Sequence, residues 1–419
     1  MSDKQVMNRW LVVLGAIMIQ FCLGALYAWS VFTPSLKNDY GWSVGQTQGV
    51  FAASLAVFAI VMVMAGKVMP KFGPRLLAMV GGVVVGLGYI LGGLVDPSNF
   101  WLMFLFIGVV GGAGIGITYV VPIAVGMRWF PDKKGLITGL AVAGFGFGAL
   151  LWVKLAADWG NLIANFGLPT TFVIYGIIFL IVVVIGGIWM VFPPEGWVPA
   201  GWTGVSVATG NKKAVALKDY VAKEMLATPQ FYMIFFAFVA GSGAGLMSIG
   251  LMKLFPMQAL QANGYDMAEA SVIAGTAIAV YFSIFNGLGR IAWGMIADYI
   301  GGKWSVFLMM LTQGIIVILF PFMAGTKVLL YLGAAIIGFN FGGNFSLFPT
   351  ITAGAFGSKN IAQLYPWVFL AYGVGGIFGP MIGGKLGDLG NFPLAFTICG
   401  ILCIIAAIVV ACIRRQKKA

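Results

Sequence analysis

Arg290 is the residue of this sequence whose setting points most directly to chemistry. It lies in an apolar run, residues 278–297, in which every other residue is uncharged. A permanent positive charge at membrane depth costs at least about 2.5–3.5 kcal/mol on insertion scales, so it needs a compensating use. The planar guanidinium matches a carboxylate through two parallel hydrogen bonds. We therefore predict that Arg290 binds a carboxylate; the alternative is a structural arginine that bonds backbone carbonyls or reaches Asp298.

Three polar side chains are candidates to share this site. Asn286 lies one helical turn before Arg290, so both should project from one face. Its amide offers hydrogen bonds without neutralising the guanidinium. Tyr119 and Tyr27 lie in glycine-rich runs elsewhere and each carries a hydroxyl on an apolar ring. We favour a cavity role for Tyr119, because Gly114 and Gly116 are expected to leave space beside it, whereas binding and packing stay equally open for Tyr27.

Acidic residues are missing from the middle of the apolar runs, so a deep carboxylate relay is not expected. Asp266, just before the run that holds Arg290, is the proton-coupling candidate. Its alternative role, with Glu269, is to cap and complement the start of a helix.

Several kinds of chemistry are excluded by what the sequence lacks. Histidine is absent, and the four cysteines lie in or at the ends of apolar runs without metal-site or disulfide spacing. No Gly-Lys-Ser/Thr loop is present to cradle the phosphates of ATP. We therefore predict no metal, no cofactor, no disulfide and no enzymatic activity.

The elements that must position Arg290 are membrane-spanning helices. The 419 residues are 61% hydrophobic and 9% charged, with mean hydropathy +1.00. Continuously apolar runs long enough to cross about 30 Å of hydrocarbon recur twelve times, which predicts an all-α integral membrane protein and favours helices over a barrel. The expected spans are 10–33, 48–69, 76–95, 100–125, 135–157, 170–192, 231–252, 270–297, 305–324, 328–351, 362–385 and 394–413.

The basic residues predict the orientation. With loops assigned alternately, most of the 24 Lys and Arg fall on the side of the termini, and the other side receives Lys37, Lys154, Lys253, Lys327 and Lys385. This asymmetry predicts cytoplasmic termini. The net charge of +12 suits anionic lipid headgroups and requires no nucleic acid.

The chain is expected to consist of two six-helix halves, residues 1–192 and 231–419. The polar stretch 193–230 between them reads as a cytoplasmic linker with a short surface helix near 217–227. The loops Gly66–Arg75 and Gly294–Lys303 repeat the same glycine and basic spacing. Parallel repeats of this kind, flanking a midplane cavity, are the architecture of many secondary transporters.

Specific motifs resemble a known family. The loop Gly294–Lys303 resembles the cytoplasmic loop motif of the major facilitator superfamily, so we expect Asp298 and Lys303 to act as a conformational latch whose charge contacts break between states. Segments 24–32, 128–136, 228–231, 286–290 and 339–343 resemble the oxalate/formate antiporter family of that superfamily, which is related to the monocarboxylate transporters of animals. The resemblance implies a carboxylate carrier in a prokaryotic inner membrane, with Arg290 as the substrate arginine and Tyr27 and Tyr119 in the aromatic cage.

One departure from that family bears on the substrate. Its oxalate carriers place a lysine in the eleventh helix for the second carboxylate, and that position is Tyr372 here; the tenth-helix aromatics fall at Phe341 and Phe345, without polar tips. One fixed charge with apolar walls favours a small monocarboxylate such as lactate, pyruvate, formate, acetate or propionate. Oxalate would leave one carboxylate without a cationic partner, at a cost of several kcal/mol.

We therefore predict a secondary carrier of small monocarboxylates that works by alternating access, either coupled to protons or by anion exchange. It is expected to be a monomer in contact with membrane lipids. Two alternatives are an oxalate:formate or other dicarboxylate antiporter, and a membrane sensor that signals through residues 193–230.

Overall fold

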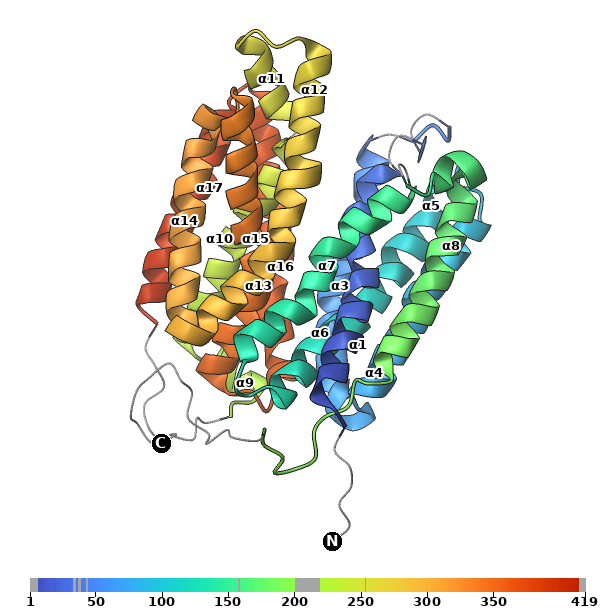
Figure 1. Ribbon diagram of the computed structural model, residues 1–419, viewed down its shortest axis with the longest axis vertical. Helices are drawn as coiled ribbons and strands as arrows, with labels where there is room; N and C mark the ends of the chain where they lie inside the picture. The colour runs from blue at the N-terminus through green and yellow to red at the C-terminus, as the bar shows by residue number, and fades with distance from the viewer. Residues whose placement is uncertain are drawn as a thin grey trace. The chain divides into compact units, whose positions relative to one another are not determined.

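The structure, a computed structural model, describes residues 7–32, 35–36, 39–42, 44–156, 159–199, 219–252 and 254–413. Within these ranges the chain forms helices and no strands. Twelve of the helical segments are long and apolar enough to cross a membrane; Figure 1 shows the course of the helices. The predicted all-α membrane fold is confirmed.

The helices of the first half are α1 (Arg9–Leu23) with the 3-10 helix η1 (Gly24–Val31), α3 (Val44–Phe72), α4 (Pro74–Leu94), α5 (Phe100–Met103) with the π-helix η2 (Phe104–Gly111), α6 (Gly112–Trp129), α7 (Lys134–Ala156) and α8 (Leu162–Gly187). Those of the second half are α9 (Ala222–Leu226), α10 (Pro229–Leu251), α11 (Leu254–Ala262), α12 (Met267–Thr276) with the π-helix η3 (Ala277–Phe282), α13 (Ser283–Ile300), α14 (Gly302–Met323), α15 (Lys327–Phe356), α16 (Ile361–Asp388) and α17 (Phe392–Ala411).

Each expected span coincides with one of these crossings, and the differences are local. The sixth begins at Leu162, earlier than expected, because a short extra helical piece precedes a break at Gly167, whose φ of 77° suits glycine ahead of Pro169. The loop before the eighth span contains α11, which forms a hairpin with α12 (Figure 1) and was not expected. The expected surface helix near 217–227 is α9, although residues 200–218 of the predicted linker lie outside the described part of the chain.

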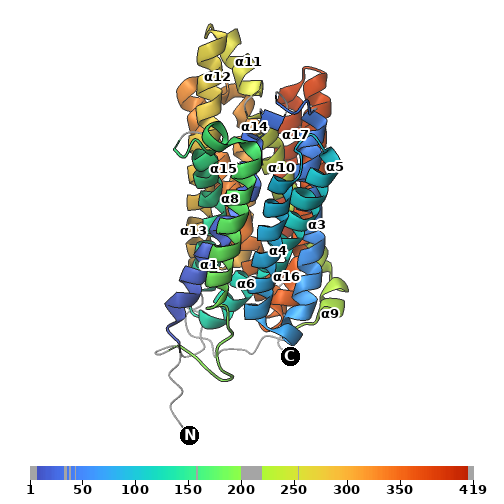
Figure 2. The ribbon, with the colours of Figure 1, turned by 90° about the vertical axis from the view of Figure 1, so that its right-hand side faces the viewer.

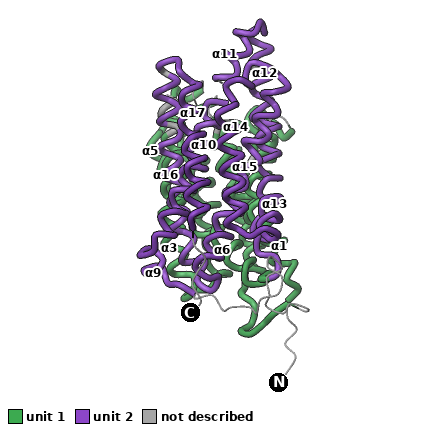
Figure 3. Tube along the Cα trace, turned by 90° about the vertical axis from the view of Figure 1, so that its left-hand side faces the viewer, with its two compact units in different colours: residues 1–131, 140–202 green, residues 132–139, 203–419 purple. Residues whose placement is uncertain are grey.

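Contacts along the chain divide it into two compact units, coloured separately in Figure 3. Unit 1 comprises residues 1–131 and 140–202, and unit 2 comprises 132–139 and 203–419. The predicted division at 192 and 231 therefore misses one feature, since the first turns of α7 belong by their contacts to unit 2. The basic residues at 212–218 and 414–418, used to predict orientation, lie outside the described ranges.

Small residues bring the helices of unit 1 together. Helices α4 and α8 run side by side (Figure 2), and a Cβ at Gly86 would lie 2.8 Å from the carbonyl oxygen of Gly176. Gly144 and Gly148 of α7 likewise meet the backbone of Ile17 and Phe21 in α1. Such close backbone approach is how helices pack in lipid.

In unit 2, glycine residues likewise allow α13 and α15 to approach closely. A Cβ at Gly289 would collide with the carbonyl oxygen of Phe339, and one at Gly342 with that of Asn286. The atoms in the way belong to the backbone, so they cannot rotate aside as the end of a flexible side chain could. The face of α13 that carries Asn286 and Arg290 is therefore held tightly against α15.

Candidate functional site

Arg290 is completely buried in α13. Its Nε donates to Asn286 Oδ1 at 3.3 Å, which confirms that the two side chains share one face. Its guanidinium carbon lies 4.2 Å from the centre of the Phe345 ring. A cation over an aromatic face is attracted by the negative ring quadrupole, by about 2 kcal/mol or more when desolvated. Asn286 and Phe345 thus hold the guanidinium from two directions without removing its charge.

The other predicted aromatic residues of the second half pack on the ring that lies over this arginine. Phe345 packs edge-to-face with Phe341 of the same helix at 5.4 Å and with Tyr372 of α16 at 5.3 Å. Phe341 itself fills the space over Gly245 of α10, where any side chain would strike the ring. Residues predicted from three separate helices therefore converge on one apolar shell, with Arg290 as its charged member.

The predicted tyrosines of the first half meet at a residue that the sequence analysis missed. Tyr119 of α6 is buried, Tyr27 of η1 is half-buried, and both pack edge-to-face on Phe145 of α7, at 5.6 and 5.0 Å. Gln20 of α1 donates from Nε2 to the Tyr119 carbonyl oxygen at 3.1 Å. The only feature of the sequence that could have pointed to Phe145 is its position between Gly144 and Gly146.

The space expected beside Tyr119 at its neighbouring glycines is occupied by other helices, so this expectation was wrong. Gly114 and Gly116 do not open space beside the tyrosine. A Cβ at Gly114 would strike the backbone of Val85 in α4, and one at Gly116 would lie 2.6 Å from the Phe58 carbonyl oxygen in α3. The glycines serve close helix packing, so a role for Tyr119 in binding must rest on other grounds.

Asp298 is bound to the start of α7. Its Oδ1 accepts from the Gly135 N–H at 2.7 Å, and its Oδ2 from the Leu136 N–H at 2.8 Å. These amides are among the donors that an α-helix leaves unsatisfied at its N-terminus, and a carboxylate there also complements the helix dipole. Gly135 and Gly294 allow the two backbones to touch beside this contact.

Lys303, the other half of the predicted latch, has a different partner. Its Nζ donates to the carbonyl oxygen of Ile413, just after α17, at 2.8 Å. The structure thus gives Asp298 and Lys303 separate contacts, both at helix ends. Their opening and closing during a transport cycle stays a prediction.

Replacing Asp298 with alanine should destabilise the protein, because two N–H groups of α7 lose their acceptor. Loss of a helix-capping side chain typically costs about 0.5–2 kcal/mol. The measurement is a thermal melt of the detergent-purified protein. The comparison is Asp266→Ala, which removes an exposed cap elsewhere in unit 2. Equal melting temperatures of Asp298→Ala and wild type would contradict the role assigned to Asp298.

Asp266, the proton-coupling candidate, is the exposed N-cap of α12. Its Oδ1 accepts from the Glu269 N–H at 2.8 Å. This is the capping role that the sequence analysis offered as the alternative. A second role in proton coupling is not required by the geometry.

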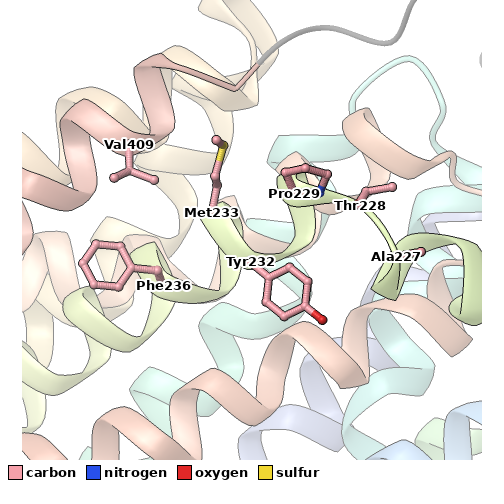
Figure 4. A pocket seen from close by; sticks show the side chains of 7 residues that line it. All are labelled: Ala227, Thr228, Pro229, Tyr232, Met233, Phe236 and Val409. Atoms are coloured by element: carbon pink, nitrogen blue, oxygen red, sulfur yellow. The ribbon is translucent and has the colours of Figure 1, made fainter.

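A surface pocket of about 540 Å³ opens on unit 2 at the start of α10 and is shown in Figure 4. Its lining is mostly apolar and includes Tyr232, Phe236 and Val409. None of the predicted site residues lines it. The candidate site is instead placed at Arg290, because that charged side chain is completely buried.

Comparison with protein families decides the class of this chain. The model of the Major Facilitator Superfamily matches residues 10–281 and 254–419. The chain belongs to the Major Facilitator Superfamily. The resemblance of the loop Gly294–Lys303 to the loop motif of this superfamily agrees with that membership.

Members of the superfamily that are similar along nearly the whole chain support the predicted resemblance. The "Oxalate:formate antiporter" of Oxalobacter formigenes is 29% identical, covering 95% of this chain and 90% of that protein. "Monocarboxylate transporter 14" of Homo sapiens is 25% identical, covering 94% and 88%. The chain is thus homologous to the family predicted from its motifs.

The fold is matched by a solved superfamily member. The proton:xylose symporter XylE, bound to 6-bromo-6-deoxy-D-glucose, aligns with a TM-score of 0.65 over 96% of this chain and 94% of its own. The sequences are 12% identical, so this likeness concerns the fold alone.

Proposed function

We propose that this protein is a secondary carrier of small monocarboxylates, such as lactate or pyruvate and including formate or acetate, and that Arg290 binds the carboxylate. The observation that carries the proposal is a fully buried guanidinium in a membrane-spanning helix, with an amide acceptor and an aromatic face as neighbours. A buried permanent charge at membrane depth is costly and typically marks a substrate pathway.

The arrangement around the guanidinium suits a carboxylate. Arginine carries five N–H donors in a rigid fork, and Asn286 accepts from the one at Nε. We propose that the edge bearing the terminal amino groups binds the two carboxylate oxygens in parallel. Tyr27 and Tyr119 remain candidate substrate residues, as the family resemblance implies.

The shell around Arg290 favours a substrate with one charge and a small apolar body. Phe341 and Phe345 have no polar group, and Tyr372, which contacts Phe345, stands where the family resemblance places the second cation of oxalate carriers. Both relatives are named for the transport of carboxylates. A second candidate, oxalate:formate exchange, is favoured by the 29% identity with the bacterial antiporter.

Counterflow into proteoliposomes separates the two candidates. Purified protein is reconstituted with internal lactate, pyruvate, formate or oxalate, and uptake of the labelled acid is followed. We expect the monocarboxylates to be transported faster than oxalate. Faster oxalate flux would instead support the dicarboxylate exchanger and contradict the interpretation of Tyr372. Binding of the acids without any flux would point to a sensor.

We further propose that the carrier lies in the inner membrane of a prokaryote with both termini in the cytoplasm, as its basic residues suggest. The same vesicles test the coupling. An inward proton gradient is expected to stimulate uptake, whereas flux that ignores the gradient but needs an internal anion would establish obligatory exchange. Asp266→Asn shows whether that acid takes part.

A further inference from the structure

Three buried amide side chains of unit 2 have polar atoms that make no hydrogen bond within the described part of the chain. They are Gln313 of α14 and Asn340 and Asn344 of α15, which are 1%, 2% and 1% exposed. Gln313 leaves both Nε2 and Oε1 without a partner, Asn340 leaves Nδ2 and Asn344 leaves Oδ1. A buried polar atom without a partner is energetically costly, so the group calls for a ligand.

The packing of α14 on α15 places Gln313 opposite Asn340. The two helices run antiparallel, with Gly302 against Ile351, Met309 against Gly343 and Phe320 against Gly333. Because one helix runs up while the other runs down, the residue numbers of facing positions add up to a nearly constant value. Gln313 and Asn340 add up to the same value as these pairs, so they lie opposite each other. Asn340 is anchored from a third helix, because its Oδ1 accepts from Trp293 Nε1 of α13 at 3.1 Å.

Asn344 faces the same region from one turn further along α15. Its Oδ1 lies 2.6 Å from the point that a Cβ on Gly241 of α10 would occupy, and the methyl group of Met310 borders the same point. Met310 precedes Gln313 by three residues, so both lie on one side of α14. The three amides therefore converge between α10, α13, α14 and α15.

The unmatched atoms identify the ligand by their chemistry. Two are acceptors, on Gln313 and Asn344, and two are donors, on Gln313 and Asn340. A metal cation would serve only the acceptors and an anion only the donors, whereas water both donates and accepts. Buried water typically makes about three such bonds to otherwise unsatisfied groups.

We infer that this amide cluster, Gln313, Asn340 and Asn344, is a binding site for internal water. The site is independent of the proposed substrate. It links α14 to the part of α15 where Asn344 directly precedes Phe345, whose ring lies over the guanidinium of Arg290, and where Asn340 precedes Phe341, which packs on Phe345. The water thus helps to hold the helices that carry the candidate site.

Radiolytic hydroxyl-radical labelling tests the water directly, because water cleaved inside a protein oxidises the side chains beside it. Met309 and Met310, one turn from Gln313, are 0% exposed, as are Met62 and Met247 elsewhere. Peptide mass spectrometry of the irradiated, purified wild type should show Met309 and Met310 oxidised several-fold faster than Met62 and Met247. Equal rates would show a dry cluster and overturn the inference.

A substitution gives an independent reading. Gln313→Leu should bring the labelling of Met309 and Met310 down to that of the other two methionines and lower the melting temperature, since Asn340 and Asn344 lose their bridge. Thr312→Val, on the exposed side of α14, should change neither. A rise in melting temperature for Gln313→Leu would mean that a dry, unsatisfied amide had been removed. If that variant does not fold, the wild-type rates decide.

Discussion

Arg290→Ala is expected to abolish transport. The substitution removes the one charge that we propose for the substrate carboxylate, and a charge-assisted hydrogen bond contributes about 1.5–3 kcal/mol, or roughly 10–100-fold in affinity. Two such bonds and the cation's field would be lost together. The measurement is uptake of labelled lactate or pyruvate into proteoliposomes. An alanine variant that still transports would end the proposal.

Two controls separate binding from folding. Arg290→Lys keeps the charge beside Phe345 but loses the planar fork, so binding should weaken while the protein still inserts and purifies. A thermal melt with and without lactate or pyruvate then reads binding directly. Wild type should be stabilised by saturating ligand through mass action, and Arg290→Ala should show no ligand shift. An alanine variant that retains the shift would place the carboxylate elsewhere.

Gly289→Ala is expected to damage both stability and transport. The added methyl group would meet the Phe339 carbonyl oxygen, so α13 and α15 must move apart. Overpacking of this kind costs about 1–3 kcal/mol. Because Asn286 and Arg290 lie on α13 and Phe345 lies on α15, the separation also disturbs the contacts around the guanidinium. The readouts are the melting temperature and the initial rate of uptake.

Gly354→Ala is the matched control for this variant. Gly354 is also in α15, but a Cβ there would have no atom within 4 Å. Alanine favours helix over glycine by about 1 kcal/mol, so this variant should be as active as wild type and at least as stable. Similar behaviour of the two variants would show that the contact at Gly289 does not constrain the site.

Local patterns predicted the candidate site only in part. The pairing of Asn286 with Arg290 followed from one helical turn of spacing, and the structure confirms it. The family resemblance singled out Phe341, Phe345 and Tyr372; Phe345 lies over that arginine, and the other two rings pack on Phe345. Phe145 was missed because its partners, Tyr27 and Tyr119, come from two other helices.

The same limit explains the wrong inference from glycine. Gly114 and Gly116 were read as open space next to Tyr119, but the neighbouring helices fill it. A sequence shows that a side chain is missing and does not show which backbone takes its place. Asp298 likewise was a recognisable loop acid, yet only the structure showed that it binds the first amides of α7.

The sequence by itself determined that the protein is an all-α membrane protein, where its twelve candidate spans lie and that Arg290 is an isolated charge. These follow from the length and continuity of apolar runs, and a membrane demands both of every segment that crosses it, whatever its neighbours. The tertiary structure alone decided which aromatic ring lies over the guanidinium, which amides gather around Gln313 and which helix Asp298 caps. Those contacts join residues far apart in the chain, and they depend on how closely glycine allows two backbones to approach, which no local pattern records.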